Sequence, residues 1–194
     1  MALSGPTLVR WFGMGSAFIV VLSAMTAAIL AMALSTSWVM FLVALCVVGL
    51  TSGSLDSLGA GFITAIRDVG SAGLIHGAYG VGASIGPLLV VAVRDWRGAL
   101  GVSAAIVLGA TMVAATAQDA WPDIAPHVRR TGTKPPLFAS ALSLGAFAAF
   151  VAIEVTTGQW VFTHLTEERG ADDTLSAVGV ALFWGGMTVG RLAL

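Results

Sequence analysis

The sequence predicts an all-α, polytopic membrane protein with about six transmembrane helices. Apolar residues fill 57% of the 194 positions, and Asp, Glu, Lys and Arg together fill 10%, whereas soluble domains carry about 25% charged residues. The apolar segment LIHGAYGVGASIGPLLVV, residues 74–91, also holds four glycines and a proline. In water each such glycine costs a helix about 1 kcal/mol and such a proline about 3 kcal/mol. In a bilayer small residues instead allow helices to pack closely, so we expect a lipid environment.

The charge and the cysteine content exclude several kinds of site. The net charge is −1 and Lys and Arg form no cluster, so we expect no nucleic-acid partner. Cys46 is the single cysteine, which leaves neither an internal disulfide nor a thiolate metal site. The sequence contains no phosphate-binding loop and no zinc spacing. We therefore expect no metal and no cofactor.

Six apolar segments are long enough to cross a bilayer, which takes about 20 residues. The first two are separated by the polar triplet STS at 35–37. The first could instead be a signal peptide cleaved near AMALS, but its apolar core exceeds the usual length of about 7–15 residues. The expected spans are 11–34, 38–66, 72–93, 98–117, 137–162 and 175–189, the last being short.

Basic residues in the loops predict the orientation, because cytoplasmic loops carry an excess of Lys and Arg. With a cytoplasmic N-terminus, three basic residues lie outside (Arg94, Arg97 and Arg169) and six lie inside (Arg10, Arg67, Arg129, Arg130, Lys134 and Arg191). We therefore expect a multi-pass protein of the cell membrane, in the bacterial inner membrane, with its N-terminus in the cytoplasm.

The segment QDAWPDIAPHVRRTGTKPPLF is the longest polar stretch and is rich in proline and basic residues. It predicts a boundary between two groups of helices. Residues 1–118 would form part of an N-terminal bundle with four spans, 119–136 a cytoplasmic central loop, and 137–194 the start of a C-terminal bundle with two spans. The later segment HLTEERGADD is expected to be a solvated outer loop.

Several stretches resemble the major facilitator superfamily of secondary transporters, and most of all its fucose-permease-like sugar and proton symporters. GPTLVRWFG resembles the basic gating loop before the third helix, with Arg10 at the matching place. GLTSGSLDSLGAGF resembles the fourth helix, with its buried acid at Asp56. EVTTGQWVFTHL and VALFWGGMTVGRLAL resemble the seventh and eighth helices, after which Arg191 would open a second gating loop.

A glycine motif of the fifth helix adds to this resemblance. Gly73, Gly82, Gly86 and Pro87 have the spacing of that motif, and small residues along one stripe favour close helix packing. The sequence departs from the family at Ala60, where relatives often carry Asn, and at Val90 and Val91, which replace a glycine pair. The resemblance covers helices three to eight of twelve. It implies a fragment whose partners are the missing helices or a self-associated copy.

Three ionisable residues inside spans are candidates for function, since a charge at the centre of a membrane helix costs about 2.5–3.5 kcal/mol. They are Asp56, His76 and Glu154. Asp56 would lie roughly 15 Å deep, where burial disfavours a charged carboxylate. It could carry a proton as access alternates, or serve as a structural hydrogen-bond partner. His76 could contact a solute, although a satisfied histidine at a helix junction is the more common case.

Glu154, Gln159 and Trp160 form a set suited to sugars, with polar groups for hydroxyls and an indole for the C–H face of the ring. Positions 154 and 158 share a helix face, while 159 and 160 lie to one side. Trp160 could equally be an interfacial anchor. With the resemblance, these residues imply transport of a small solute, which could be a sugar, with possible proton coupling.

An intramembrane protease and a non-transporting scaffold are the alternatives to a transporter. An intramembrane aspartyl protease needs a second membrane acid and a Gly-x-Gly-Asp pattern, and GSLD lacks the second glycine. A rhomboid-like serine is also absent, because GSAG has alanine at that place, so we expect no enzyme. A non-transporting membrane scaffold, or an inactive transporter fragment, remains open.

Overall fold

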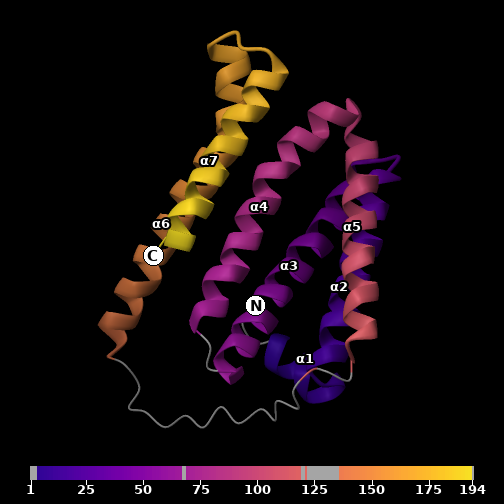
Figure 1. Cartoon of the computed structure of the whole chain (residues 1–194), viewed down its shortest axis with the longest axis vertical. Coiled ribbons are helices and arrows are strands. Elements are labelled where there is room, and N and C mark those ends of the chain that lie inside the picture. The colour runs from indigo at the N-terminus through magenta and orange to yellow at the C-terminus, as the bar shows by residue number, and fades with distance from the viewer. Residues whose placement is uncertain (1–3, 67–68, 119–120, 122–135, 194) are drawn as a thin grey trace. The chain divides into compact units, whose positions relative to one another are not determined.

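The computed structural model describes residues 4–66, 69–118, 121 and 136–193, and these residues contain helices and no strand. Six of the helices have the length and apolar composition needed to cross a membrane. This confirms the expected all-α polytopic fold. The helices (Figure 1) are α1 (Ser4–Phe12), α2 (Met14–Ala33), α3 (Trp38–Ile66), α4 (Val69–Val93), α5 (Trp96–Thr116), α6 (Leu137–Thr163), the π-helical segment η2 (His164–Glu168) and α7 (Asp173–Ala193).

The chain forms two compact units. The first comprises Met1–Ile75 and Val93–His127, and the second comprises His76–Ala92 and Val128–Leu194. This grouping places most of α4 with α6 and α7, whereas the sequence predicts that it belongs to the N-terminal bundle of four spans. The expected central loop at 119–136 lies outside the described residues, apart from Trp121 and Pro136.

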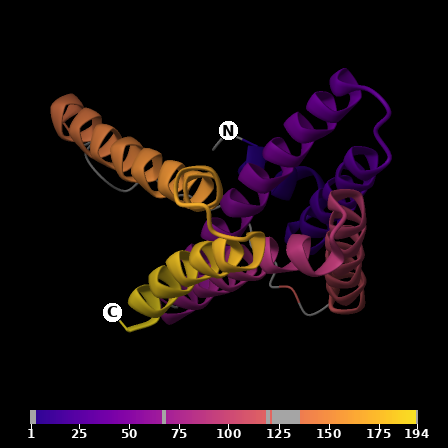
Figure 2. The same ribbon diagram turned by 90° about the horizontal axis from the view of Figure 1, so that it is seen from above.

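In the first unit α2 lies between α3 and α5 and contacts both (Figures 1 and 2). Buried side chains of α2 pack on Leu58 of α3. Hydroxyl groups in these helices donate hydrogen bonds to backbone carbonyl groups of the preceding turn. Thr26 Oγ1 donates to Leu22 O at 2.9 Å, and Thr111 Oγ1 donates to Val107 O at 2.8 Å. Such back-bonding satisfies a hydroxyl that has no water to bind.

The first span begins later than predicted. We expected a continuous helix from Trp11, but the chain breaks at Gly13, where φ is 78°, and α2 starts at Met14. Positive φ is strained for residues with a Cβ atom and easy for glycine. Trp11 therefore belongs to the separate short helix α1.

Trp121 is partly buried and packs against the core of the first unit, although its segment was predicted to be a polar loop. Its indole stacks on Phe18 with ring centroids 4.8 Å apart and meets Phe62 edge-on at 5.5 Å. A Cβ atom built on Gly15 would lie 2.8 Å from Trp121 Cδ1. The glycine thus provides the space into which the ring packs.

In the second unit α7 packs against α6 on one side and against α4 on another. Gly158 of α6 faces Trp184 of α7, and a Cβ built there would lie 2.5 Å from Trp184 Cζ2. Towards α4, Tyr79 meets Trp184 edge-on with ring centroids 5.9 Å apart. Gly80 faces Thr188 so closely that a Cβ would collide with the hydroxyl group. The buried stripe of α7 is thus covered from two sides.

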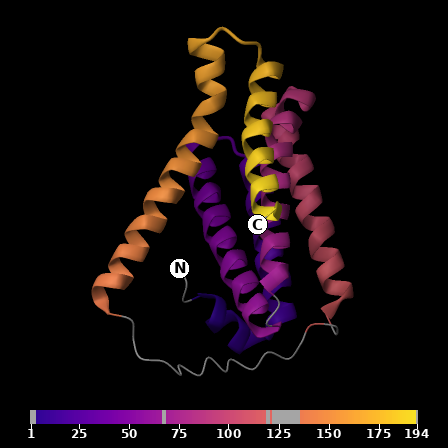
Figure 3. The ribbon, with the colours of Figure 1, turned by 60° about the vertical axis from the view of Figure 1, so that its left-hand side comes forward.

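The last two spans are longer than predicted. The helix of α6 does not end at Phe162 but continues through η2 to Glu168, so part of the expected outer loop is helical. Gly170, with φ of 66°, allows the turn, and Ala171 N donates to Leu165 O at 3.0 Å. Asp172 Oδ1 then accepts the Leu175 N–H at 2.9 Å, which caps α7. Figure 3 shows α6 and α7 joined by this turn and running in opposite directions.

Candidate functional site: an ion pair between two membrane spans

An ion pair joins α6 and α7. Arg191 Nη2 donates to Glu154 Oε1 at 3.0 Å and to Oε2 at 3.1 Å. Both residues lie within helices that could cross the membrane. From the sequence, Glu154 is predicted to contact the solute and Arg191 to open a gating loop. In the structure the two side chains belong to one site.

Helix geometry explains why residues so far apart in sequence meet. In the antiparallel pair, Leu165 lies against Gly179, Gly158 against Trp184 and Glu154 beside Arg191. Side chains tilt towards the N-terminus of their own helix. The tilts on antiparallel helices are opposed along the shared axis, so Glu154 and Arg191 lean towards each other. The arginine reaches back from a position near the end of α7.

The pair is partly enclosed. The side chain of Glu154 is 10% exposed and that of Arg191 is 28% exposed. In a membrane an isolated carboxylate or guanidinium is expensive, and such groups pair with one another or line a polar pathway. The contact uses Nη2 alone, and within the described residues Nη1 and Nε of Arg191 have no partner. The site therefore keeps N–H groups that could donate hydrogen bonds to a further ligand.

Trp160 lines an open cavity of about 440 Å³ near the turn between α6 and α7. Thr157, His164, Glu167 and Glu168 also line it. Glu154 and Gln159 are not among the residues that line this cavity. Gln159 is exposed and has no hydrogen-bond partner within the described residues. The pairing of Glu154 with position 158 on one face is as predicted, since Gly158 also contacts α7.

The glycine-rich helix α4 makes its close approaches at positions other than the motif. Gly77 faces Leu192, where a Cβ would lie 2.9 Å from Leu192 Cδ2, and Gly80 faces Thr188. A Cβ on Gly82 or Gly86 would meet no described atom within 4 Å. The helix continues to Val93 through Pro87. Gly73 lies in the same helix, and the side chain of His76 is outside the described residues.

Asp56 lies on α3 in the first unit and is exposed. Leu58, two residues on, is buried against α2, so Asp56 points to the opposite side of the helix. Among the described residues it has no hydrogen bond and no ion pair. A Cβ atom built on Gly59, three residues on, would meet no described atom within 4 Å. Arg10, the other predicted gating residue, is exposed in the last turn of α1.

Comparison with known proteins gives a partial similarity. A 45-residue segment is 40% identical to "Bypass of stop codon protein 6" of Saccharomyces cerevisiae, and it covers 23% of this chain and 9% of the yeast protein. No protein-family model and no solved structure matches the chain. The resemblance to major facilitator transporters therefore stays a prediction.

Proposed function

We propose that this chain is part of a membrane transporter of the major facilitator type, which moves a small solute by alternating access. Sugars are the first class of solute to test. The proposal rests on one observation, the ion pair of Glu154 with Arg191 between two apolar helices. Ionisable residues inside membrane spans mark substrate and ion pathways by default.

The geometry of the pair supports this proposal. Arg191 holds both carboxylate oxygens through one nitrogen, so a solute with hydroxyl or carboxylate oxygens could bind the remaining N–H groups without displacing Glu154. A solute could also replace Glu154 as the partner of Arg191, which would release the contact between α6 and α7. Transporters alternate access by movements of helix bundles around a site near the bilayer midplane.

Asp56 is the candidate proton carrier in this proposal. It is an acid within an apolar span and has no hydrogen-bond or ion-pair partner among the described residues. A proton taken up on one side of the membrane and released on the other would couple transport to the proton gradient. Asp56→Asn should abolish accumulation against a gradient and leave downhill exchange of the solute.

The direct test is solute uptake in proteoliposomes under an imposed proton gradient. The 194-residue chain is compared with a version extended to twelve helices, against a panel of sugars and other small solutes. Uptake by either form supports the proposal, and dependence on the gradient supports coupling through a proton. Absence of uptake by both forms across the panel would count against transport.

A non-transporting membrane scaffold is the second candidate. One observation favours it, because Asp56 lies on an uncovered helix face where a charge facing lipid is costly. A partner helix that carries a basic residue would remove that cost. Copurification of a stoichiometric membrane partner, lost in Asp56→Asn, together with absence of uptake, would favour the scaffold.

A further inference from the structure

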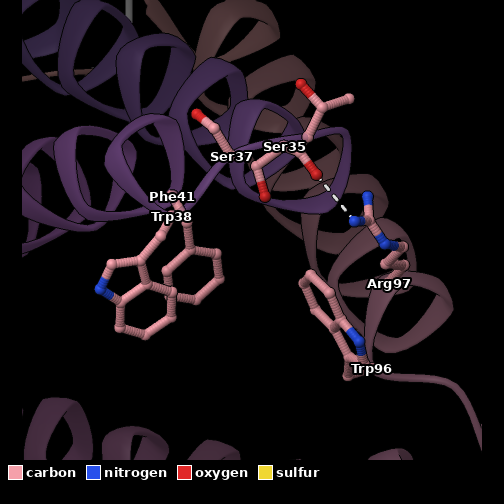
Figure 4. Close-up of a pocket in the computed structure, with 7 residues that line it drawn as sticks. Ser35, Ser37, Trp38, Phe41, Trp96 and Arg97 are labelled. Carbon is pink, nitrogen blue, oxygen red and sulfur yellow. Dashed lines mark hydrogen bonds between the residues drawn. The ribbon is translucent and has the colours of Figure 1, made fainter.

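A cavity of about 340 Å³ lies in the first unit where three membrane helices end. It is formed by the turn between α2 and α3 and by the first residues of α5. The turn between α2 and α3 follows the first membrane span, and the turn between α4 and α5 follows the third. The two turns therefore lie on the same side of the bilayer. The ends of the spans are also where lipid headgroups are found. The cavity is lined by Ser35, Thr36, Ser37, Trp38, Phe41, Trp96 and Arg97 (Figure 4).

Three aromatic rings form one wall of this cavity. Trp38 and Phe41 stack with ring centroids 5.5 Å apart, and Phe41 meets Trp96 edge-on at 5.9 Å. Trp38 is 71% exposed and Trp96 is 45% exposed. Tryptophan rings at a membrane surface sit at the level of the headgroups, with an apolar body and one polar N–H.

Arg97 supplies the charge of the site. It lies over the Trp96 ring, with Cζ 4.6 Å from the ring centroid. Its Nη1 donates to Ala33 O and its Nη2 to Ser35 O, both at 2.7 Å. A guanidinium has five N–H donors, so three remain after these two contacts. The two carbonyl groups fix the guanidinium in place and leave it exposed towards the cavity.

Two residues with hydroxyl groups, Thr36 and Ser37, line the same cavity as Arg97. Ser37 Oγ accepts the Met40 N–H at 3.2 Å and keeps its own proton to donate. Thr36 is exposed and has no hydrogen bond within the described residues. Asp95 precedes the lining residues of α5 and is not in the lining itself; its carboxylate accepts the backbone N–H groups of Arg97 and Gly98. The lining of the cavity thus includes hydroxyl donors and one cation, the groups that bind an oxyanion.

We infer that this cavity binds the phosphate group of a membrane phospholipid. Arg97, Thr36 and Ser37 would donate to the phosphate oxygens, and the Trp38 and Trp96 rings would pack on the glycerol and the first part of the acyl chains. The volume is within the range of about 300–1,000 Å³ found for small-ligand sites. A phospholipid suits the position better than a solute from the water phase, since the aromatic wall is set at the end of membrane spans.

The test is a titration of the purified full chain in detergent, with bound lipid counted by native mass spectrometry. The ligand is phosphatidylglycerol, and diacylglycerol with the same acyl chains is the matched control without phosphate. We expect saturable binding of one phosphatidylglycerol and no comparable binding of diacylglycerol. Equal binding of the two lipids would overturn the assignment. Binding of inorganic phosphate alone with the same affinity would also overturn it, because the lipid part would then contribute nothing.

Variants locate the site. Arg97→Lys keeps the charge but loses the planar fork, and we expect binding about ten-fold weaker, the effect of one charge-assisted hydrogen bond. Because Arg97 also ties α2 to α5, Thr36→Val serves as a second variant that removes one hydroxyl and no described contact. Arg94→Lys and Trp11→Leu change the same residue types outside the cavity and should bind as the parent does. Parent-like binding by both Arg97→Lys and Thr36→Val would overturn the proposal.

Discussion

Arg191 reaches across from α7 and donates to both carboxylate oxygens of Glu154 on α6, at 3.0 and 3.1 Å. The contact pairs two charges that would each be costly alone in an apolar span. It also fixes the register of the two helices at the end remote from their connecting turn. Loss of either charge should therefore affect both stability and any transport through this site.

A double-mutant cycle tests the strength of the pair. Glu154→Gln or Arg191→Gln alone leaves an unpaired charge, whereas the double variant leaves none. We expect each single variant to unfold more easily than the double variant, with a coupling energy of about 1–3 kcal/mol. Equilibrium unfolding of the four proteins in mixed micelles measures this energy. Strictly additive effects would mean that the two side chains are independent.

The close approach of α6 to α7 makes Gly158 sensitive to size. A Cβ at this position would lie 2.5 Å from Trp184 Cζ2, and overpacking costs about 1–3 kcal/mol. Gly158→Val should lower the midpoint of thermal unfolding. Gly145→Val on the same helix is the control, because a Cβ there meets no described atom within 4 Å. A similar loss in both variants would show that helix propensity, not packing, causes the change.

The contact of α4 with α7 predicts a contrast between two neighbouring glycines. Gly80→Ala would place a methyl group against Thr188, whereas Gly82 faces open space within the described chain. We expect Gly80→Ala to be destabilised by about 1–3 kcal/mol. Gly82→Ala should be neutral or more stable by up to about 1 kcal/mol, the gain in helix propensity. Thermal unfolding in the same detergent compares them, and an equally stable Gly80→Ala would refute the packing.

The Asp56→Asn variant should lose proton coupling while keeping its stability. It makes no hydrogen bond or ion pair among the described residues, so Asp56→Asn should change the free energy of unfolding by no more than about 0.5 kcal/mol. Accumulation of solute against a gradient should be lost. Unfolding and gradient-driven uptake are measured on the same preparation. Full accumulation by the variant would remove Asp56 from the coupling mechanism, and a large loss of stability would indicate a structural role.

The all-helical membrane fold could be predicted because it follows from composition and segment length. The helix ends were less accurate. Gly13 breaks the first span and Gly170 ends the π-helical extension of α6 through positive φ, which apolar composition does not reveal. The packing of Trp121 on Phe18 was not predicted either, because the residues around Trp121 in the sequence are polar.

Parts of the candidate site followed from helix periodicity and parts did not. The spacing of four placed Glu154 and Gly158 on one face, and both contact α7. The identity of the partner, Arg191, could not be predicted, because it depends on the length of the π-helical turn and on the tilt of two side chains. The aromatic wall beside Arg97 was not predicted, although tryptophans at the ends of two spans are typical of a membrane interface.

The most direct test of the central claim is solute uptake by Glu154→Gln in proteoliposomes, in the form of the protein that transports, compared with the parent and with Gly145→Ala. The account predicts that Glu154→Gln inserts and folds but takes up solute at least about ten-fold more slowly, the effect of about 1.4 kcal/mol on the barrier. Gly145→Ala should match the parent. Uptake by a folded Glu154→Gln at the parental rate would contradict a role of the Glu154–Arg191 pair in transport.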